Sequence, residues 1–198
     1  MLLLLPTHEV FTMGIQPKHQ HLSVEDYLTG EEGGEQRHEY IGGEVYAMVG
    51  TSDRHNLIAL NLATVLRPHV RGTPCRLFMS DMKVRLRVAS DDAFYYPDLM
   101  LACDPDDRAT YYRTHPCLIV EVLSDTTERI DRREKLLAYT SIDSLQEYVL
   151  LSQNRIEAEL HRRADGWRAQ VISSGDVRFQ CLGLTVPLTT IYEDVPMP

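Results

Sequence analysis

Two carboxylates stand inside apolar stretches of the sequence, where an ionised side chain is unfavourable. Glu121 lies within the run CLIVEVL at 117–123, and Asp98 lies within YYPDLML. An ionised carboxylate in such a run carries a large desolvation cost unless it is paired, protonated or bound to a cation. Because the two stretches are consecutive strand candidates that could pair, we expect Asp98 and Glu121 side by side, where a hard divalent cation would relieve their repulsion.

Each acid also has an ordinary structural explanation. Glu121 could reach solvent at a strand end or form a buried ion pair with an arginine, and Asp98 could be a turn aspartate that follows Pro97. Proline cannot donate to a strand ladder, so Pro97 predicts an edge position or a β-bulge, and bulges often lie beside active sites.

Lys135 is the third candidate for the same site. The predicted helix over 127–140 places Asp131, Lys135 and Tyr139 along one stripe. Such a stripe could be an exposed ion pair worth about 0.3–0.5 kcal/mol. Alternatively, the ammonium of Lys135 points back at the carboxylates, where it could orient a water and stabilise charge on a phosphate.

The elements that must position these groups follow from hydrophobic periodicity and turn residues. A Gly42-Gly43 turn predicts a hairpin over 37–49. Helices are expected over 23–29, 53–70 and 127–140. Strands are expected over 76–88, 94–102, 117–123 and 145–151, followed by a β tail over 155–161, 167–172 and 179–186. This order predicts an α+β fold: a mixed sheet flanked by helices, with an N-terminal hairpin and a C-terminal antiparallel appendix. We expect one domain over 23–198 and a flexible arm over 1–22.

Composition excludes several classes of protein. The chain has 198 residues, 43% apolar and 25% charged, which is typical of a globular domain and excludes a disordered or fibrous chain. No apolar run reaches the roughly 18 residues of a membrane helix, and the opening Leu2–Leu5 run is too short for a signal peptide. The net charge of −9 argues against coating nucleic acid by charge alone, but not against acting on it through a bound metal.

The four cysteines, Cys75, Cys103, Cys117 and Cys181, lack the close C-x-x-C spacing of a zinc site. We expect reduced thiols in a cytoplasmic protein, with Cys117 behaving as a small buried hydrophobe.

An ordered set of motifs resembles a known family. The chain carries, in order, EYIGGEV at 39–45, SxxH at 52–55, YPD at 96–98, VEVLS at 120–124, DxxxKxxxY at 131–139 and QEYV at 146–149. This combination resembles the Uma-two group of restriction endonucleases, a domain of unknown function in the PD-(D/E)XK nuclease superfamily. The resemblance covers residues 23–195 and implies the restriction-endonuclease-like fold.

The resemblance also implies roles for individual residues. Asp98 corresponds to the first acid of the superfamily and Glu121 to the second. The signature lysine should follow the second acid by two residues, where this chain has Leu123, and in this group it looks displaced to Lys135. The family suggests a further acid from the N-terminal region, for which we choose Glu44 over Glu39.

The implied activity is metal-dependent hydrolysis of phosphodiester bonds by an endonuclease, with DNA as the expected nucleic acid. Asp98, Glu121 and the backbone carbonyl of Val122 would hold Mg²⁺ or Mn²⁺, while Lys135 positions the attacking water. The match of the SxxH motif also places His55 near the site, whereas a cap or surface histidine at a helix start is the ordinary alternative.

Two other functions remain open at this point: an inactive nuclease fold used as a binding module, and a glycoside hydrolase using the two acids. Two basic groups could contact DNA phosphates or could be solvated faces: Lys83, Arg85 and Arg87 on a strand, and Arg129, Arg132 and Arg133 on the helix of Lys135. The sequence also permits a homodimer.

Overall fold

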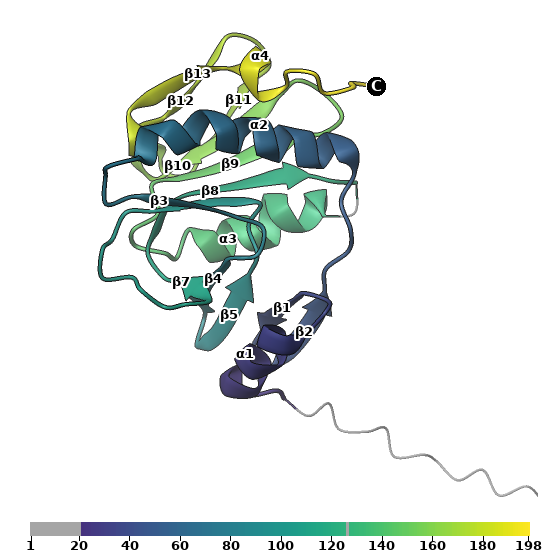
Figure 1. Ribbon diagram of the computed structural model, residues 1–198, viewed down its shortest axis with the longest axis vertical. Helices are drawn as coiled ribbons and strands as arrows, with labels where there is room; N and C mark the ends of the chain where they lie inside the picture. The colour runs from purple at the N-terminus through teal and green to yellow at the C-terminus, as the bar shows by residue number, and fades with distance from the viewer. Residues whose placement is uncertain (1–20, 126) are drawn as a thin grey trace, which may run out of the picture.

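The computed structural model describes residues 21–125 and 127–198, which form two sheets and a small C-terminal hairpin (Figure 1). The arm expected over 1–22 lies outside the described residues except for its last two. Leu22 already contacts the N-terminal hairpin: its N–H donates to the carbonyl of Gly43 (2.9 Å), and its own carbonyl accepts from the Tyr40 hydroxyl (2.9 Å).

A six-stranded mixed sheet forms the centre of the fold, in the order β11-β10-β9-β8-β6-β3. Its strands are β3 (Arg76–Met79), β6 (Leu99–Ala102), β8 (Pro116–Leu123), β9 (Glu147–Ser152), β10 (Ala158–Arg162) and β11 (Ala169–Ile172). Strand β8 pairs antiparallel with β6 and parallel with β9. Every residue of β8 is buried because both faces of the sheet are covered.

Alternate residues of β8 face the two coverings of this sheet. Leu118, Val120 and Val122 pack in one apolar core with α2 (Asp53–Val70). Ile119 and Leu123 pack in a second core on the opposite face. There they meet the π-helical segment η1 (Ile130–Lys135) and its continuation α3 (Leu136–Tyr139), and Figure 1 shows α2 and α3 on opposite sides of the sheet.

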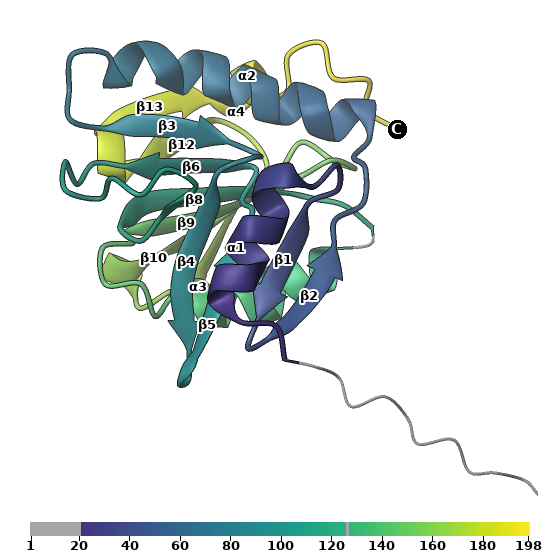
Figure 2. The ribbon, with the colours of Figure 1, turned by 60° about the horizontal axis from the view of Figure 1, so that its bottom comes forward.

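A second sheet has five strands, in the order β2-β1-β5-β4-β7, and contacts α3 through β4. Its strands are β1 (His38–Ile41), β2 (Glu44–Ala47), β4 (Lys83–Val88), β5 (Asp91–Tyr95) and β7 (Tyr112–Arg113). Helix α1 (Val24–Gly33) lies against this sheet (Figure 2). Its Tyr27 packs on Tyr40 and Phe94. Ser23 caps α1 by accepting a hydrogen bond from the Asp26 N–H (3.1 Å), as Ser, Asp and Asn commonly do at this position.

The C-terminal appendix is the hairpin of β12 (Asp176–Phe179) and β13 (Leu184–Pro187), followed by α4 (Leu188–Ile191). Two short 3₁₀ turns, η2 (Arg163–Asp165) and η3 (Gln180–Leu182), precede β11 and β13. Val177, Phe179 and Val186 bury their side chains in the α2 core, so the appendix completes that core.

The predicted α+β class is confirmed. The structure differs in three of the expected strands, each of which is divided into two. Residues 76–88 form β3 and β4, which belong to different sheets, and residues 94–102 are divided between β5 and β6. Ser80 has a positive φ of 42° at the first break, and Pro97 lies at the second. The stretch 179–186 turns at η3. Apolar residues continue on both sides of each break, so hydrophobicity alone does not show where a strand ends.

The expectation of reduced thiols is wrong for this structure, which records two disulfides, Cys75–Cys103 and Cys117–Cys181. The antiparallel pairing of β3 with β6 brings Cys75 opposite Cys103, and η3 brings Cys181 to the start of β8. Cys117 is buried, as expected.

Within residues 21–125 and 127–198, no helix combines the length and apolar character that a bilayer crossing requires.

Candidate active site

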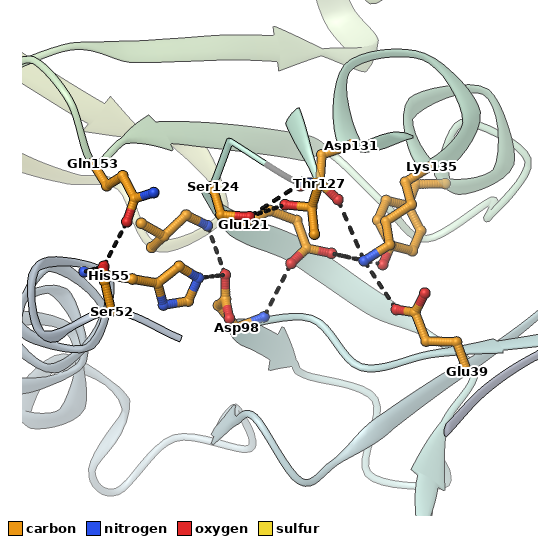
Figure 3. A network of polar contacts seen from close by, with 12 residues as sticks. Glu39, Ser52, His55, Asp98, Glu121, Ser124, Thr127, Asp131, Lys135 and Gln153 are labelled. Atoms are coloured by element: carbon orange, nitrogen blue, oxygen red, sulfur yellow. Dashed lines mark hydrogen bonds and ion pairs between the residues drawn. The ribbon is translucent and has the colours of Figure 1, made fainter. Parts of the chain in front are cut away.

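Asp98 and Glu121 lie side by side at the junction of the two sheets (Figure 3). The register that pairs Leu99 with Val120 brings Asp98, one residue earlier, opposite Glu121. The Asp98 N–H donates to Oε2 of Glu121 (3.3 Å), and the Val122 N–H donates to Oδ2 of Asp98 (2.7 Å). The backbone of β8 therefore fixes the orientation of the Asp98 carboxylate.

Lys135 points at these carboxylates from the π-helical segment η1 (Figure 3). Its Nζ lies 3.1 Å from Oε1 of Glu121, 2.9 Å from Oε1 of Glu39 and 3.4 Å from Oδ1 of Asp131. The side chain is buried, so the alternative of an exposed ion pair is excluded. Single π-helical turns inside helices occur frequently at functional sites.

The ammonium of Lys135 is kept charged by its neighbours. Burial opposes the charged form, but the surrounding carboxylates raise the pKa of the amine well above its usual value. In order of effect, they belong to Glu121, Glu39 and Asp131. Lys135 is therefore a hydrogen-bond donor and a fixed positive charge at neutral pH, not a base.

Glu121 is the carboxylate in the least favourable position for a charge. Its Oε1 accepts from the Tyr139 hydroxyl (3.0 Å) as well as from Lys135, and the side chain is 5% exposed. Burial raises its pKa well above the usual value; Lys135 opposes this shift, whereas the charges of Asp131 and Asp98 add to it. A further positive charge at this position would favour the ionised form.

Glu39, not Glu44, joins this cluster from the N-terminal hairpin. Glu39 accepts from Lys135 and from the Tyr96 N–H (3.4 Å). Glu44 is exposed, and its carboxylate accepts from the Tyr46 hydroxyl (2.7 Å). The pairing of Ile41 with Glu44 and of Glu39 with Tyr46 puts both acids on the same face of the hairpin, so the choice of Glu44 identified the face but not the position along it.

His55 lies beside Asp98, at the start of α2. Its Nε2 is 3.1 Å from Oδ2 of Asp98, and the side chain is buried. Ser52 caps the helix by accepting from the His55 N–H (3.1 Å), and its own hydroxyl donates to Oε1 of Gln153 (2.6 Å). The SxxH spacing thus fixes the histidine at the helix start.

Asp131 is a site residue that sequence reasoning did not select, although it marked the stripe that carries it. Asp131 is 2% exposed, and its Oδ1 has no hydrogen-bond partner among the described residues beyond the charge contact with Lys135. Its position four residues before Lys135 on a helix is the signal that could have identified it.

The two basic clusters expected to face DNA are largely paired within the protein. Lys83 is buried, and its Nζ donates to the Tyr96 hydroxyl (3.1 Å), while Arg85 pairs with Asp92 (3.0 Å). On the helix, Arg132 pairs with Glu128 (2.8 Å). Neither cluster is therefore a free basic face, and Arg87 and Arg133 are the exposed members without such an ion pair within the described ranges.

A cavity of about 240 Å³ opens onto these groups. Its lining includes Glu39, His55, Asp98, Glu121, Val122, Asp131 and Lys135. Carboxylate and carbonyl oxygens are ligands of hard cations such as Mg²⁺ and Mn²⁺. The arrangement can therefore hold a divalent cation next to a fixed ammonium, a combination suited to stabilising charge on a phosphate.

Comparison with known proteins identifies similar chains. The uncharacterized protein slr1290 of Synechocystis sp. is 37% identical over 175 residues, which is 86% of this chain and 91% of that protein. The uncharacterized protein sll1609 of the same organism is 34% identical over 135 residues, or 67% and 75% of the two chains. A solved structure from Anabaena variabilis, described as "a putative nuclease belonging to DUF820", has a TM-score of 0.67 at 15% identity. It covers 80% of this chain and 91% of that one, and this likeness shows the fold.

The family model named Uma2, described as "Putative restriction endonuclease", matches residues 24–189. This match spans both sheets, α2, the η1–α3 helix and the C-terminal hairpin. Together with the two relatives, it agrees with the family resemblance of the motifs. The chain belongs to the Uma2 family of restriction-endonuclease-like proteins.

Proposed function

We propose that the protein is a metal-dependent endonuclease that hydrolyses phosphodiester bonds in DNA. The observation that carries this proposal is the convergence of Asp98, Glu121 and Lys135 on one cavity, drawn from two strands and a helix. The family description of a restriction endonuclease supports DNA as the substrate.

The donor set fits Mg²⁺ or Mn²⁺. Asp98, Glu121 and the backbone carbonyl of Val122 would hold the ion, because the three residues line the same cavity and each has an oxygen ligand to offer. Four carboxylates gather here against the single ammonium of Lys135, counted within the described residues, so the site carries excess negative charge for a cation to balance. When bound, such an ion polarises a phosphate and lowers the pKa of a coordinated water.

Lys135 positions the attacking water and stabilises the phosphate. Its charge is fixed by three carboxylates, and the three hydrogens of its ammonium face Glu39, Glu121 and Asp131. To hold a water or phosphate oxygen while keeping Glu121, the ammonium would exchange its longest contact, 3.4 Å to Asp131, for that oxygen. In the hydrolysis, the water oxygen forms a bond to phosphorus as the bond from phosphorus to the leaving oxygen breaks. The developing negative charge on the phosphate then lies close to a preorganised cation.

Glu39 and His55 act through these groups. Glu39, on the five-stranded sheet, forms an ion pair with the Lys135 ammonium. His55, at the start of α2, contacts the Asp98 carboxylate. We therefore assign Glu39, in place of Glu44, as the acid that the N-terminal hairpin contributes.

The test is nicking of supercoiled plasmid DNA by the purified chain with Mn²⁺ or Mg²⁺, and with a chelator as the blank. We expect nicking by the wild type and a loss of about 100-fold or more in Asp98→Asn and Lys135→Ala. Asp98→Asn is the cleaner variant, because an amide oxygen can still accept from the Val122 N–H. Glu25→Gln, on the exposed side of α1, is the matched control and should nick as the wild type does.

Lys135→Ala leaves two buried carboxylates and one partly buried carboxylate without their cation, so its fold must be checked by circular dichroism before its activity is interpreted. Intact plasmid with wild-type protein and Mn²⁺, or equal nicking by a folded Asp98→Asn, contradicts the proposal. Absence of nicking together with no calorimetric Mg²⁺ binding would instead indicate an inactive nuclease fold used for binding.

A further inference from the structure

All four cysteines of the chain gather at one place, at the end of the six-stranded sheet away from Asp98. Cys75 immediately precedes β3, Cys103 immediately follows β6, Cys117 is the second residue of β8, and Cys181 lies in η3. The structure pairs them as Cys75–Cys103 and Cys117–Cys181. Four separate segments thus contribute one sulfur each.

The two disulfides are in contact with each other. Sγ of Cys103 lies 3.7 Å from Sγ of Cys117, and the sulfurs of Cys103, Cys117 and Cys181 all lie within 4.8 Å of one another. A tetrahedral zinc site has Zn–S bonds of about 2.3 Å, which puts neighbouring sulfurs about 3.8 Å apart. Sγ of Cys103 and Sγ of Cys117, which belong to different disulfides, therefore already stand at the separation that a shared zinc ion requires.

Backbone contacts hold these sulfurs in place independently of the disulfides. A β-bulge interrupts the β6–β8 register where Ala102 pairs with Pro116, next to both Cys103 and Cys117. The Cys117 carbonyl accepts from the Gln146 N–H (2.9 Å). The Cys181 N–H donates to Oε2 of the fully buried Glu147 (3.0 Å). We therefore expect the segments that carry Cys103, Cys117 and Cys181 to stay close together when the sulfur–sulfur bonds open.

An ion can reach the cluster from solvent. Cys75 lines a cavity of about 450 Å³, while Cys117 is 6% exposed and closes the inner side. Partial burial suits a structural metal site, because thiolates shielded from water are compensated by a doubly charged ion.

We propose that the reduced chain binds one Zn²⁺ through Cys75, Cys103, Cys117 and Cys181. Each disulfide takes two electrons and two protons from a dithiol reductant, whose own two thiols become a disulfide. Zn²⁺ then displaces the thiol protons to solvent and forms four Zn–S bonds. The ion connects the same four segments that the two disulfides connect. This end of the sheet is then cross-linked by disulfides in the oxidised chain and by the metal in the reduced chain. This proposal does not depend on nuclease activity.

The test uses Co²⁺ as a spectroscopic probe for the zinc site, on the full chain. The protein is reduced with a phosphine, freed of reductant and metal without oxygen, and checked for four titratable thiols. We expect one thiolate-bound Co²⁺ per chain, with the intense visible bands of tetrahedral cobalt and a thiolate-to-cobalt charge-transfer band in the near ultraviolet. One equivalent of Zn²⁺ should abolish both.

Two variants separate this site from the carboxylates. Asp98→Asn should bind Co²⁺ with the same charge-transfer band, because it alters the opposite end of the sheet. Cys181→Ser, at a partly exposed position, should weaken Co²⁺ binding at least about tenfold and reduce the charge-transfer intensity. A folded, four-thiol wild type that binds no Co²⁺ with sulfur-to-metal absorption overturns the proposal, as does unchanged absorption in Cys181→Ser. Disulfides that resist reduction in the folded chain overturn it as well.

Discussion

Strands β6 and β8 carry opposite kinds of chemistry at their two ends. At one end, Asp98 and Glu121 place hard oxygen groups beside an ammonium. At the other end, Cys103 and Cys117 place soft sulfurs in contact. The register of a single antiparallel pair, from Leu99 opposite Val120 to Ala102 opposite Pro116, separates the two. Hard cations prefer the first set of donors and thiophilic ions the second.

The two ends also differ in how their groups are compensated. The sulfur end is closed by covalent bonds in this structure. The acid end keeps more carboxylates than Lys135 can neutralise, and burial raises the pKa of Glu121 above its usual value. The groups at the sulfur end therefore contribute to the stability of the folded chain. The carboxylates at the acid end reduce that stability, because they are buried as charges without enough positive charge to balance them.

The largest effect on stability should come from removing the sulfur bridges. In the chain-entropy description, closing loops of 28 and 64 residues contributes about 3.6 and 4.3 kcal/mol at 25 °C. Urea unfolding without reductant, with a chelator present, should therefore show that Cys117→Ala with Cys181→Ser destabilises the chain by up to about 4 kcal/mol. Cys75→Ser with Cys103→Ser should cost about 0.7 kcal/mol less. If both double variants lose less than about 1 kcal/mol of unfolding free energy, the disulfides contribute little stability and the sulfur end does not differ from the acid end in this respect.

The next effect concerns the two glutamates of the hairpin. Glu39→Gln removes a charged partner of Lys135, so we expect nicking to fall about tenfold or more. Glu44→Gln changes an exposed side chain that touches Tyr46, so its activity should stay within about twofold of the wild type. Steady-state nicking rates measure both. The reverse ranking would show that the hairpin contributes its acid from β2.

The smallest effect is a gain in stability at the acid end. A carboxyl group whose pKa is raised in the folded state destabilises that state as the pH rises above the unfolded value. Glu121→Gln should therefore raise the stability of the metal-free protein by about 1 kcal/mol at neutral pH, while the advantage disappears near pH 4. Thermal unfolding with a chelator across this range is the measurement. A variant that is less stable at every pH would show that the pair with Lys135 outweighs the burial of the charge.

Much of the acid site could be predicted from the sequence. Glu121 interrupts an apolar strand, Asp98 follows a proline in another, and Lys135 shares a helical stripe with Asp131. Each of these signals depends only on neighbouring residues in the sequence, so a single sequence is enough to detect it. Glu39 could not be distinguished from Glu44 in this way. Periodicity predicts which face of the hairpin carries the acids, but which of the two acids contacts Lys135 depends on how the sheets pack.

The sulfur cluster was not predictable from spacing. Its members come from four segments, and the separations of 28 and 64 residues within the disulfides match no metal motif. The division of residues 76–88 between two sheets was hidden for a related reason. Apolar residues lie on both sides of Ser80, and only packing shows that β3 and β4 belong to different sheets.

That division places Asp98 where the chain crosses between the sheets. The chain passes from one sheet to the other between β3 and β4 and again between β5 and β6, and the Ser80 N–H donates to the Asp98 carbonyl (3.1 Å) where the two passages meet. Glu39, on the five-stranded sheet, pairs with Lys135 at 2.9 Å. The position of the Lys135 ammonium beside Glu121 therefore depends on the packing of both sheets, and a substitution that shifts one sheet against the other would alter the site without touching its residues.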